Sequence, residues 1–189
     1  MRYMQKVKMK SQWPPKIERE EFEILKFISA YSHLPHGRSF VVDSKQETPD
    51  YFLKDGKTGE IYGIELTSVY LYDRSVPDEH MKAINGWEEI PDDPTAIEKH
   101  NLRLIETVKT KVQKARKYYD TFHPLILAVY INEYISIYMD ETDWVDLIRA
   151  NDSILNDIEP FSEIVLWNLA NESAMSIIPT CDRQATKST

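Results

Sequence analysis

The chain has 189 residues, of which 42% are apolar and 29% carry a charge, values that favour one well-filled globular core over two. Its net charge of −8 counts against a protein whose whole surface grips nucleic acid, because phosphate binding needs lysine and arginine, although a local basic cleft is not excluded. The one cysteine, Cys181, excludes an internal disulfide and a cysteine-built zinc site, and it fits a reducing cytosol.

The sequence has no pattern typical of a secretory signal or a membrane span. The basic first sixteen residues lack the apolar run of a signal peptide. The longest apolar stretch, residues 125–131, is far too short to cross a bilayer. We therefore expect a cytoplasmic protein that does not bind membranes.

Composition indicates one domain with three additions. Residues 1–16 are basic and lack periodicity, which indicates an N-terminal arm. Residues 17–180 hold the periodic segments and are expected to form a single α/β domain. Within them, residues 73–94 carry three prolines and many acids, so we expect an acidic insertion that offers a surface to a protein partner. Residues 181–189 are polar and are expected to form a flexible tail.

Residues 17–31 predict the first helix. Phe22, Leu25 and Ile28 recur at helical spacing with charged residues between them, which indicates one apolar stripe on a solvated helix. A proline and a glycine follow within six residues of its end and stop it.

Three short strands are expected after this helix. Each is a run of β-branched and aromatic residues, and a turn sequence with two glycines at residues 55–59 joins the last two strands into a hairpin. The three strands are expected at residues 39–42, 50–53 and 61–70.

The second half of the chain alternates helices and strands. Its long helix opens after a proline and stops before the His-Pro pair at 123–124. A long helix between two strands indicates an α/β fold with a mixed sheet that helices cover on its faces. The expected elements are helices at 95–119 and 140–149, and strands at 125–132, 162–169 and 175–178.

Two carboxylates mark the predicted hairpin. Asp50 lies at the mouth of one strand and Glu65 lies inside the next, which has apolar residues on both of its sides. Such a strand is central and buried on both faces, and a carboxylate within it is costly unless it is paired, hydrogen-bonded or bound to a metal. Two carboxylates presented from a tight hairpin offer the hard oxygen ligands that suit a divalent metal.

These segments, Pro49-Asp50 and Gly63-Ile64-Glu65-Leu66-Thr67, resemble the core motif of the PD-(D/E)xK nuclease superfamily. The resemblance implies a restriction-endonuclease-like mixed sheet flanked by helices, with core order α-β-β-β-α-β. It further implies that Asp50, Glu65 and the carbonyl of Leu66 bind Mg²⁺ or Mn²⁺, and that the chain hydrolyses phosphodiester bonds in nucleic acid, with DNA as the expected partner.

The last letter of that motif is usually a lysine two residues after the glutamate, and here that position is Thr67. In some members of the family the lysine comes from the following helix instead. Lys111 interrupts the apolar stripe that includes Val108 and Ala115, so we prefer it to Lys114 as the catalytic lysine. The alternative is a lysine that lies at the stripe edge and reaches out to solvent.

The superfamily often places a glutamate on its first helix. We choose Glu21, which is in line with Leu25 and Ile28 and so could face the sheet. Acids early in a helix also interact favourably with the helix dipole, which is an alternative explanation. The competing residues in this helix are Glu18, Glu20 and Glu23.

Two other interpretations remain open. The chain could be a catalytically inactive nuclease-fold module that binds protein or nucleic acid, because Thr67 replaces the lysine and the surface is acidic. It could instead be an unrelated α/β domain in which Glu65 is only ion-paired. A homodimer is also left open, and His33 and His36 are not assigned a role because histidines in a loop seldom bind metal or phosphate.

Overall fold

The computed structural model describes residues 6–8, 16–69, 87–89, 95–120, 122–131, 139–168 and 173–178. Most of the expected N-terminal arm, most of the acidic insertion at 73–94 and the whole tail at 181–189 lie outside these residues. The exceptions are β1 (Lys6–Lys8) and β5 (Trp87–Glu89), two three-residue strands that pair antiparallel in a small sheet of their own.

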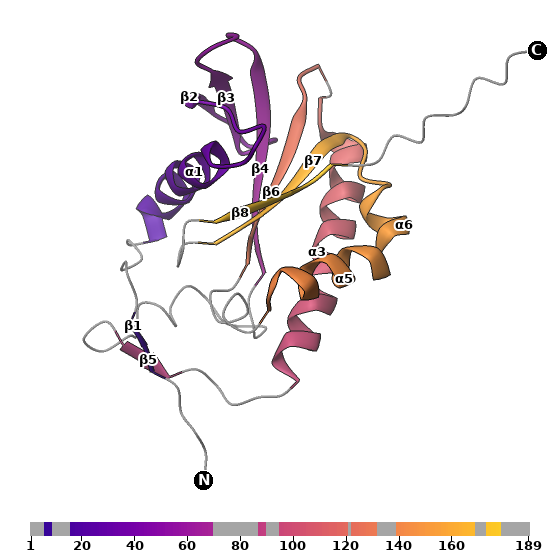
Figure 1. Ribbon diagram of the computed structural model, residues 1–189. Coiled ribbons are helices and arrows are strands. Elements are labelled where there is room, and N and C mark those ends of the chain that lie inside the picture. The colour runs from indigo at the N-terminus through magenta and orange to yellow at the C-terminus, as the bar shows by residue number, and fades with distance from the viewer. Residues whose placement is uncertain are drawn as a thin grey trace, which may run out of the picture.

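The centre of the molecule is a six-stranded mixed sheet with the order β2-β3-β4-β6-β7-β8 (Figure 1). β4 pairs in parallel with β6, and β6 in parallel with β7, whereas the outer pairs are antiparallel. The strands are β2 (Phe40–Lys45), β3 (Tyr51–Asp55), β4 (Ile61–Val69), β6 (Leu125–Ile131), β7 (Phe161–Trp167) and β8 (Ala174–Ile177).

Helices cover both faces of this sheet (Figure 1). α1 (Lys16–Ser32) lies on one face, and α3 (Ala96–Tyr118), α5 (Glu141–Ala150) and the short α6 (Asp152–Leu155) lie on the other. Two hydrophobic clusters fill the two layers, one under α1 and one under α3 and α5. We call the sides of the sheet the α1 face and the α3 face.

The strand β6 shows why the sheet is central to the fold. All seven of its residues, Leu-Ile-Leu-Ala-Val-Tyr-Ile, are buried. A strand with parallel neighbours and helices over both faces meets no solvent, so its sequence is continuously apolar and does not alternate. Alternate β6 side chains therefore supply both clusters, with Leu127 under α3 and Ile126 under α1.

The expected helices and strands are largely confirmed, with ends that differ by three residues or fewer. The order α-β-β-β-α-β is present in the main sheet and its helices as α1-β2-β3-β4-α3-β6, and the predicted hairpin is the antiparallel pair β3–β4. The sequence analysis missed β1, β5 and α6, which are all four residues or fewer.

The predicted apolar stripe of the first helix is only partly confirmed. Phe22 and Ile28 are partly buried against the core, but Leu25 is more than half exposed, and the buried side is centred on Ile24, Phe27 and Tyr31. The two stripes differ by one position around the helix, about 100°. Aromatic packing decides between them, because Phe27 and Tyr31 stack on each other and Phe27 also meets Trp167.

No helix among the described residues combines the length and the apolar composition that a bilayer crossing requires.

Candidate functional site

Asp50 and Glu65 lie on the same side of the sheet. Tyr51 is paired with Ile64 in the antiparallel β3–β4 ladder, so the preceding residue, Asp50, stands opposite Glu65. Residues directly opposite each other in such a pair project to the same face. The Asp50 carboxylate also accepts a hydrogen bond of 2.7 Å from the backbone N–H of Leu66, which fixes it against the strand that carries Glu65.

Glu65 is a buried carboxylate held by two lysines from α3. Its side chain is 1% exposed, and its Oε1 accepts a hydrogen bond of 2.7 Å from Lys111 Nζ. The amine of Lys114 stands 3.6 Å from the same oxygen. Lys111 is 23% exposed and Lys114 44%, so the positive charges lie between a dry carboxylate and solvent.

Asp50 and Glu65 influence each other through their charges. Burial, and next the negative charge of Glu65, raise the pKa of Asp50 to about 6, against the lowering effects of the Leu66 N–H and Lys111. A like charge at close range disfavours the ionised form of a carboxyl. The contribution of Glu65 agrees with the place of the two acids opposite each other in the β3–β4 ladder.

Two polar atoms beside this pair make no hydrogen bond of normal geometry. They are Glu65 Oε2 and the hydroxyl of Tyr119, and both are buried. Burial, and then a hydrogen-bonding interaction with Glu65, raise the pKa of the Tyr119 hydroxyl, so it stays protonated and lies near enough to Glu65 to act as a weak donor. A buried carboxylate oxygen with at most a weak donor is unfavourable in a dry interior, and it can serve as a ligand for a cation.

The arrangement of oxygens fits a divalent metal. Because the N–H and C=O of one strand residue point to the same side, the carbonyl of Leu66 faces the side on which its N–H meets Asp50. Carboxylate and carbonyl oxygens are the ligands of Mg²⁺ and Mn²⁺. Among the described residues no group of three or more His, Cys, Asp or Glu side chains could hold a metal, so an ion would depend on two carboxylates and this carbonyl.

Lys111 reaches the site as the sequence analysis expected. Leu104, Val108 and Ala115 on its side of α3 are buried, and the lysine amine ends at Glu65. Thr67, in the usual lysine position, lies two residues further along β4 and is half-buried. Tyr118 lies at helical spacing from Ala115, yet it is 61% exposed, and Tyr119 is the buried ring.

The expectation that Glu21 faces the sheet is wrong. Its side chain is exposed, because the buried side of α1 is centred on Ile24 and Phe27. Glu20 is also exposed, yet its charge contributes to the raised pKa of Asp50, and it forms an ion pair with Lys45. Among the competing glutamates Glu23 is buried, at 9% exposed, and Glu20 is one whose charge acts on Asp50.

Gly63 is closed off by neighbouring side chains. A Cβ atom there would stand 2.5 Å from Leu125 Cδ2, 2.8 Å from Pro49 Cγ and 3.5 Å from Phe52 Cε1. The glycine therefore permits close packing around β4 two residues before Glu65. It does not leave the backbone open to a ligand.

A second buried carboxylate was missed by the sequence analysis. Glu163 in β7 accepts hydrogen bonds from the hydroxyl of Tyr31 at 3.0 Å, from His36 Nε2 at 2.8 Å and from the hydroxyl of Ser176. Its signal was the same as that of Glu65, a carboxylate inside an apolar strand. His36 has a structural role here, because it joins the loop after α1 to the sheet.

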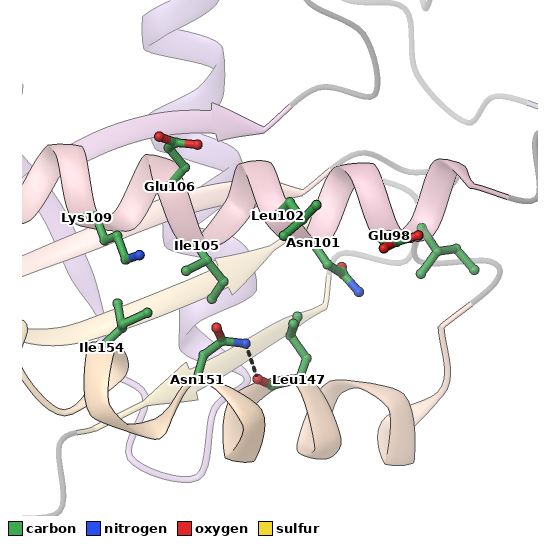
Figure 2. A pocket seen from close by; sticks show the side chains of 10 residues that line it. Glu98, Asn101, Leu102, Ile105, Glu106, Lys109, Leu147, Asn151 and Ile154 are labelled. Carbon is green, nitrogen blue, oxygen red and sulfur yellow. Dashed lines mark hydrogen bonds between the residues drawn. The ribbon is translucent and has the colours of Figure 1, made fainter.

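A groove on the far side of α3 is separate from these carboxylates. It has a volume of about 730 Å³ and lies between α3 and the α5–α6 pair (Figure 2). Ile105, Leu147 and Ile154 line its apolar part, and Glu98, Glu106 and Lys109 lie at its edge. Neither Asp50 nor Glu65 takes part in it.

Comparison of the chain with protein-family models, with curated proteins and with solved structures finds no match. Functional inference therefore depends on the geometry of the residues themselves.

Proposed function

We propose that this chain is a metal-dependent hydrolase of phosphodiester bonds in nucleic acid, built on the pattern of the PD-(D/E)xK nucleases. One observation carries the proposal. Asp50 and Glu65 stand opposite each other on neighbouring strands, a lysine amine from α3 lies 2.7 Å from Glu65, and the second Glu65 oxygen is buried without a hydrogen bond of normal geometry. Two acids and a lysine on one side of a hairpin are the groups that this chemistry needs.

Asp50, Glu65 and the Leu66 carbonyl would hold Mg²⁺ or Mn²⁺. A bound divalent ion lowers the pKa of a coordinated water and offsets negative charge on the phosphate. In the hydrolysis the water oxygen forms the new bond to phosphorus, the bond to the departing strand end breaks, and a water proton ends on that departing oxygen.

Lys111 would stabilise the negative charge that develops on the phosphate. Its ammonium group already lies at the carboxylate, so little rearrangement is needed when the reaction begins. Thr67 cannot take this role, because a hydroxyl has no positive charge at neutral pH. Glu20, in place of the expected Glu21, is the helix carboxylate that would act on Asp50 from outside.

A cleavage assay with matched variants tests the proposal. Plasmid and oligonucleotide substrates would be incubated with the purified chain in Mg²⁺ or Mn²⁺, and Glu65→Gln and Asp50→Asn should each lower the rate by at least about 100-fold. Glu163→Gln is the control, because it changes a buried strand glutamate on the opposite face. Circular dichroism would verify that each variant is folded, and cleavage that survives both site substitutions would refute the assignment.

One observation favours an inactive nucleic-acid-binding or protein-binding module as a second candidate. Two lysines pair with Glu65, so the formal charge of Asp50, Glu65, Lys111 and Lys114 together is −2 plus +2, or zero. A site without net negative charge attracts cations weakly. Titration calorimetry with Mn²⁺ separates the candidates: Glu65-dependent binding supports the enzyme, and its absence supports the module.

A further inference from the structure

We propose that the nucleic acid bound at this site is single-stranded, with bases stacked on Phe122 and phosphates held by the C-terminal half of α3. This inference rests on the proposed function, which supplies the cleavage reaction. The binding surface, however, is argued from residues outside the carboxylate pair. It consists of the exposed rings Phe122 and Tyr118 and the lysines beside them.

A row of aromatic rings leads from solvent toward the site. Phe122 is 83% exposed, and its ring meets His123 edge to face at 5.0 Å. His123 in turn meets Phe52 at 5.5 Å. A large apolar ring so fully in water has no role in the core of this domain.

The inner end of this row contacts the strand that carries Glu65. Phe52 lies against Gly63, and the Gly63 N–H donates to the carbonyl of Pro124, the residue after His123. Glu65 follows Gly63 by two residues on the same face of β4, about 7 Å along the strand. A nucleic-acid strand with one base stacked on Phe122 could therefore run its sugar-phosphate backbone past Asp50 and Glu65.

Positive charge lies beside Tyr118 and Tyr119, which precede Phe122 by four and three residues in the chain. Residues 109–117 contain five basic residues and no acid. The Lys117 amine stands 4.9 Å from the centre of the exposed Tyr118 ring, and the Lys114 amine 5.5 Å from that of Tyr119. Arg116 is bound to Asp157, so the lysines are the groups that can meet phosphates. This local charge is complementary to a nucleic acid although the whole chain carries −8.

Exposed rings favour a single strand over a duplex. Stacking needs a free base face, and the bases of a duplex present their faces to each other. Lysines spaced along a helix hold a phosphate backbone without reading its sequence. The combination is typical of surfaces that bind single strands with little sequence preference.

Fluorescence anisotropy with labelled oligothymidine, oligouridine and a duplex of equal length tests the inference, with Ca²⁺ in place of Mg²⁺ to prevent cleavage. Phe122→Ala should weaken single-strand binding by about 5- to 100-fold and leave duplex binding unchanged. Phe122→Trp should bind as well as the wild type. Leu102→Ala is the matched control, because Leu102 is 66% exposed but lines the groove on the far side of α3. The two oligonucleotides separate DNA from RNA.

The binding experiment tests the single-strand surface independently of whether the protein cleaves nucleic acid. Unchanged single-strand binding in Phe122→Ala, an equal loss on the duplex, or no binding by the wild type would overturn the single-strand surface, even if cleavage depends on Glu65. Conversely, Phe122-dependent binding by a chain that never cleaves would leave the surface standing and remove the proposed activity. Such a result would favour the inactive module.

Discussion

At neutral pH the folded protein keeps Asp50 ionised, although its surroundings in the fold disfavour the negative charge. Its pKa is about 6 in the folded chain against an ordinary value of 3.8, so the folded state binds more protons between these two values. Stability from this group is therefore fully present below about pH 4 and is lost as pH rises to about 6. The native fold tolerates an unfavourable carboxylate at neutral pH, which is common at functional sites.

The first prediction concerns this pH dependence. Asp50→Asn should raise the melting temperature at pH 7.5, because it removes a buried charge and its repulsion by Glu65, and keeps an oxygen for the Leu66 N–H. The gain should shrink as pH falls from 6 to 4 and disappear below that range. Thermal melts of both proteins across this range provide the measurement. A constant difference at all pH values would mean that Asp50 does not titrate as described.

The second prediction separates the two lysines. Lys111→Met should slow single-turnover cleavage by about 100-fold, whereas Lys114→Met should have a smaller effect because its amine stands 3.6 Å from Glu65 instead of 2.7 Å. Lys111→Met should also lower the free energy of unfolding by about 1–3 kcal/mol, since a buried carboxylate loses its nearest donor. Lys109→Met, at the edge of the separate groove, is the control. Equal effects of Lys111 and Lys114 would show that only their combined charge matters.

At the scale of elements, the β3–β4 hairpin and α3 form the site together. The hairpin sets Asp50 opposite Glu65 by its register, and α3 brings the lysine amines to the same carboxylate. A shift of one residue in the hairpin would send Glu65 to the α1 face. The packing that fixes β4 against its neighbours is therefore also what positions the site.

The third prediction tests that packing. Gly63→Ala should lower the free energy of unfolding by about 1–3 kcal/mol, because the new methyl group overlaps Leu125 and Pro49 and forces them to move. Ser68→Ala in the same strand should change it by less than about 0.5 kcal/mol. Urea unfolding curves would measure both. A neutral Gly63→Ala would mean that the side chains around β4 repack freely.

At the scale of the whole molecule, the charge of −8 coexists with a cationic helix segment. Nucleic acid bound only at that segment should release few counterions. Contacts by Lys114 and Lys117 would give a slope of about −1.4 for log affinity against log salt, at about −0.7 for each phosphate neutralised on a single strand.

The fourth prediction is that this slope is small and depends on the lysines. Lys114→Met should make the slope less negative by about 0.7, and Lys54→Met on β3, whose lysine side chain is exposed on another element, should leave it unchanged. Anisotropy titrations at several salt concentrations give the values. A slope several times steeper would place nucleic acid over far more of the surface.

The features of the fold and the site that the sequence predicts are those that depend on residues close together in the chain. Periodicity and turn chemistry located the long helices, β6 and the hairpin, and the hairpin alone was enough to pair Asp50 with Glu65. The face of α1 was not predictable, because apolar residues occupy two adjacent stripes and the choice depends on Trp167 from the other end of the chain.

The missed parts of the site have a similar cause. Helical spacing from Ala115 leads to Tyr118, but Tyr119 is the buried ring, since the helix ends there and the chain turns inward. Glu20 and Glu21 are adjacent acids, and only the place of Lys45 and Asp50 in space distinguishes them. β1 and β5 are three residues each and pair across more than 75 positions, a contact that no local pattern reveals.

The Glu163 cluster limits the order in which this chain can fold during its synthesis. Tyr31 and His36 donate to a carboxylate 132 and 127 residues later in sequence. During synthesis at about 5–20 residues per second, the helix that carries Tyr31 therefore waits about 6–25 s for its acceptor to be made. Until then its aromatic side has no β7 to cover it, so an emerging chain that stalls before residue 163 would be a natural target for chaperones and proteases.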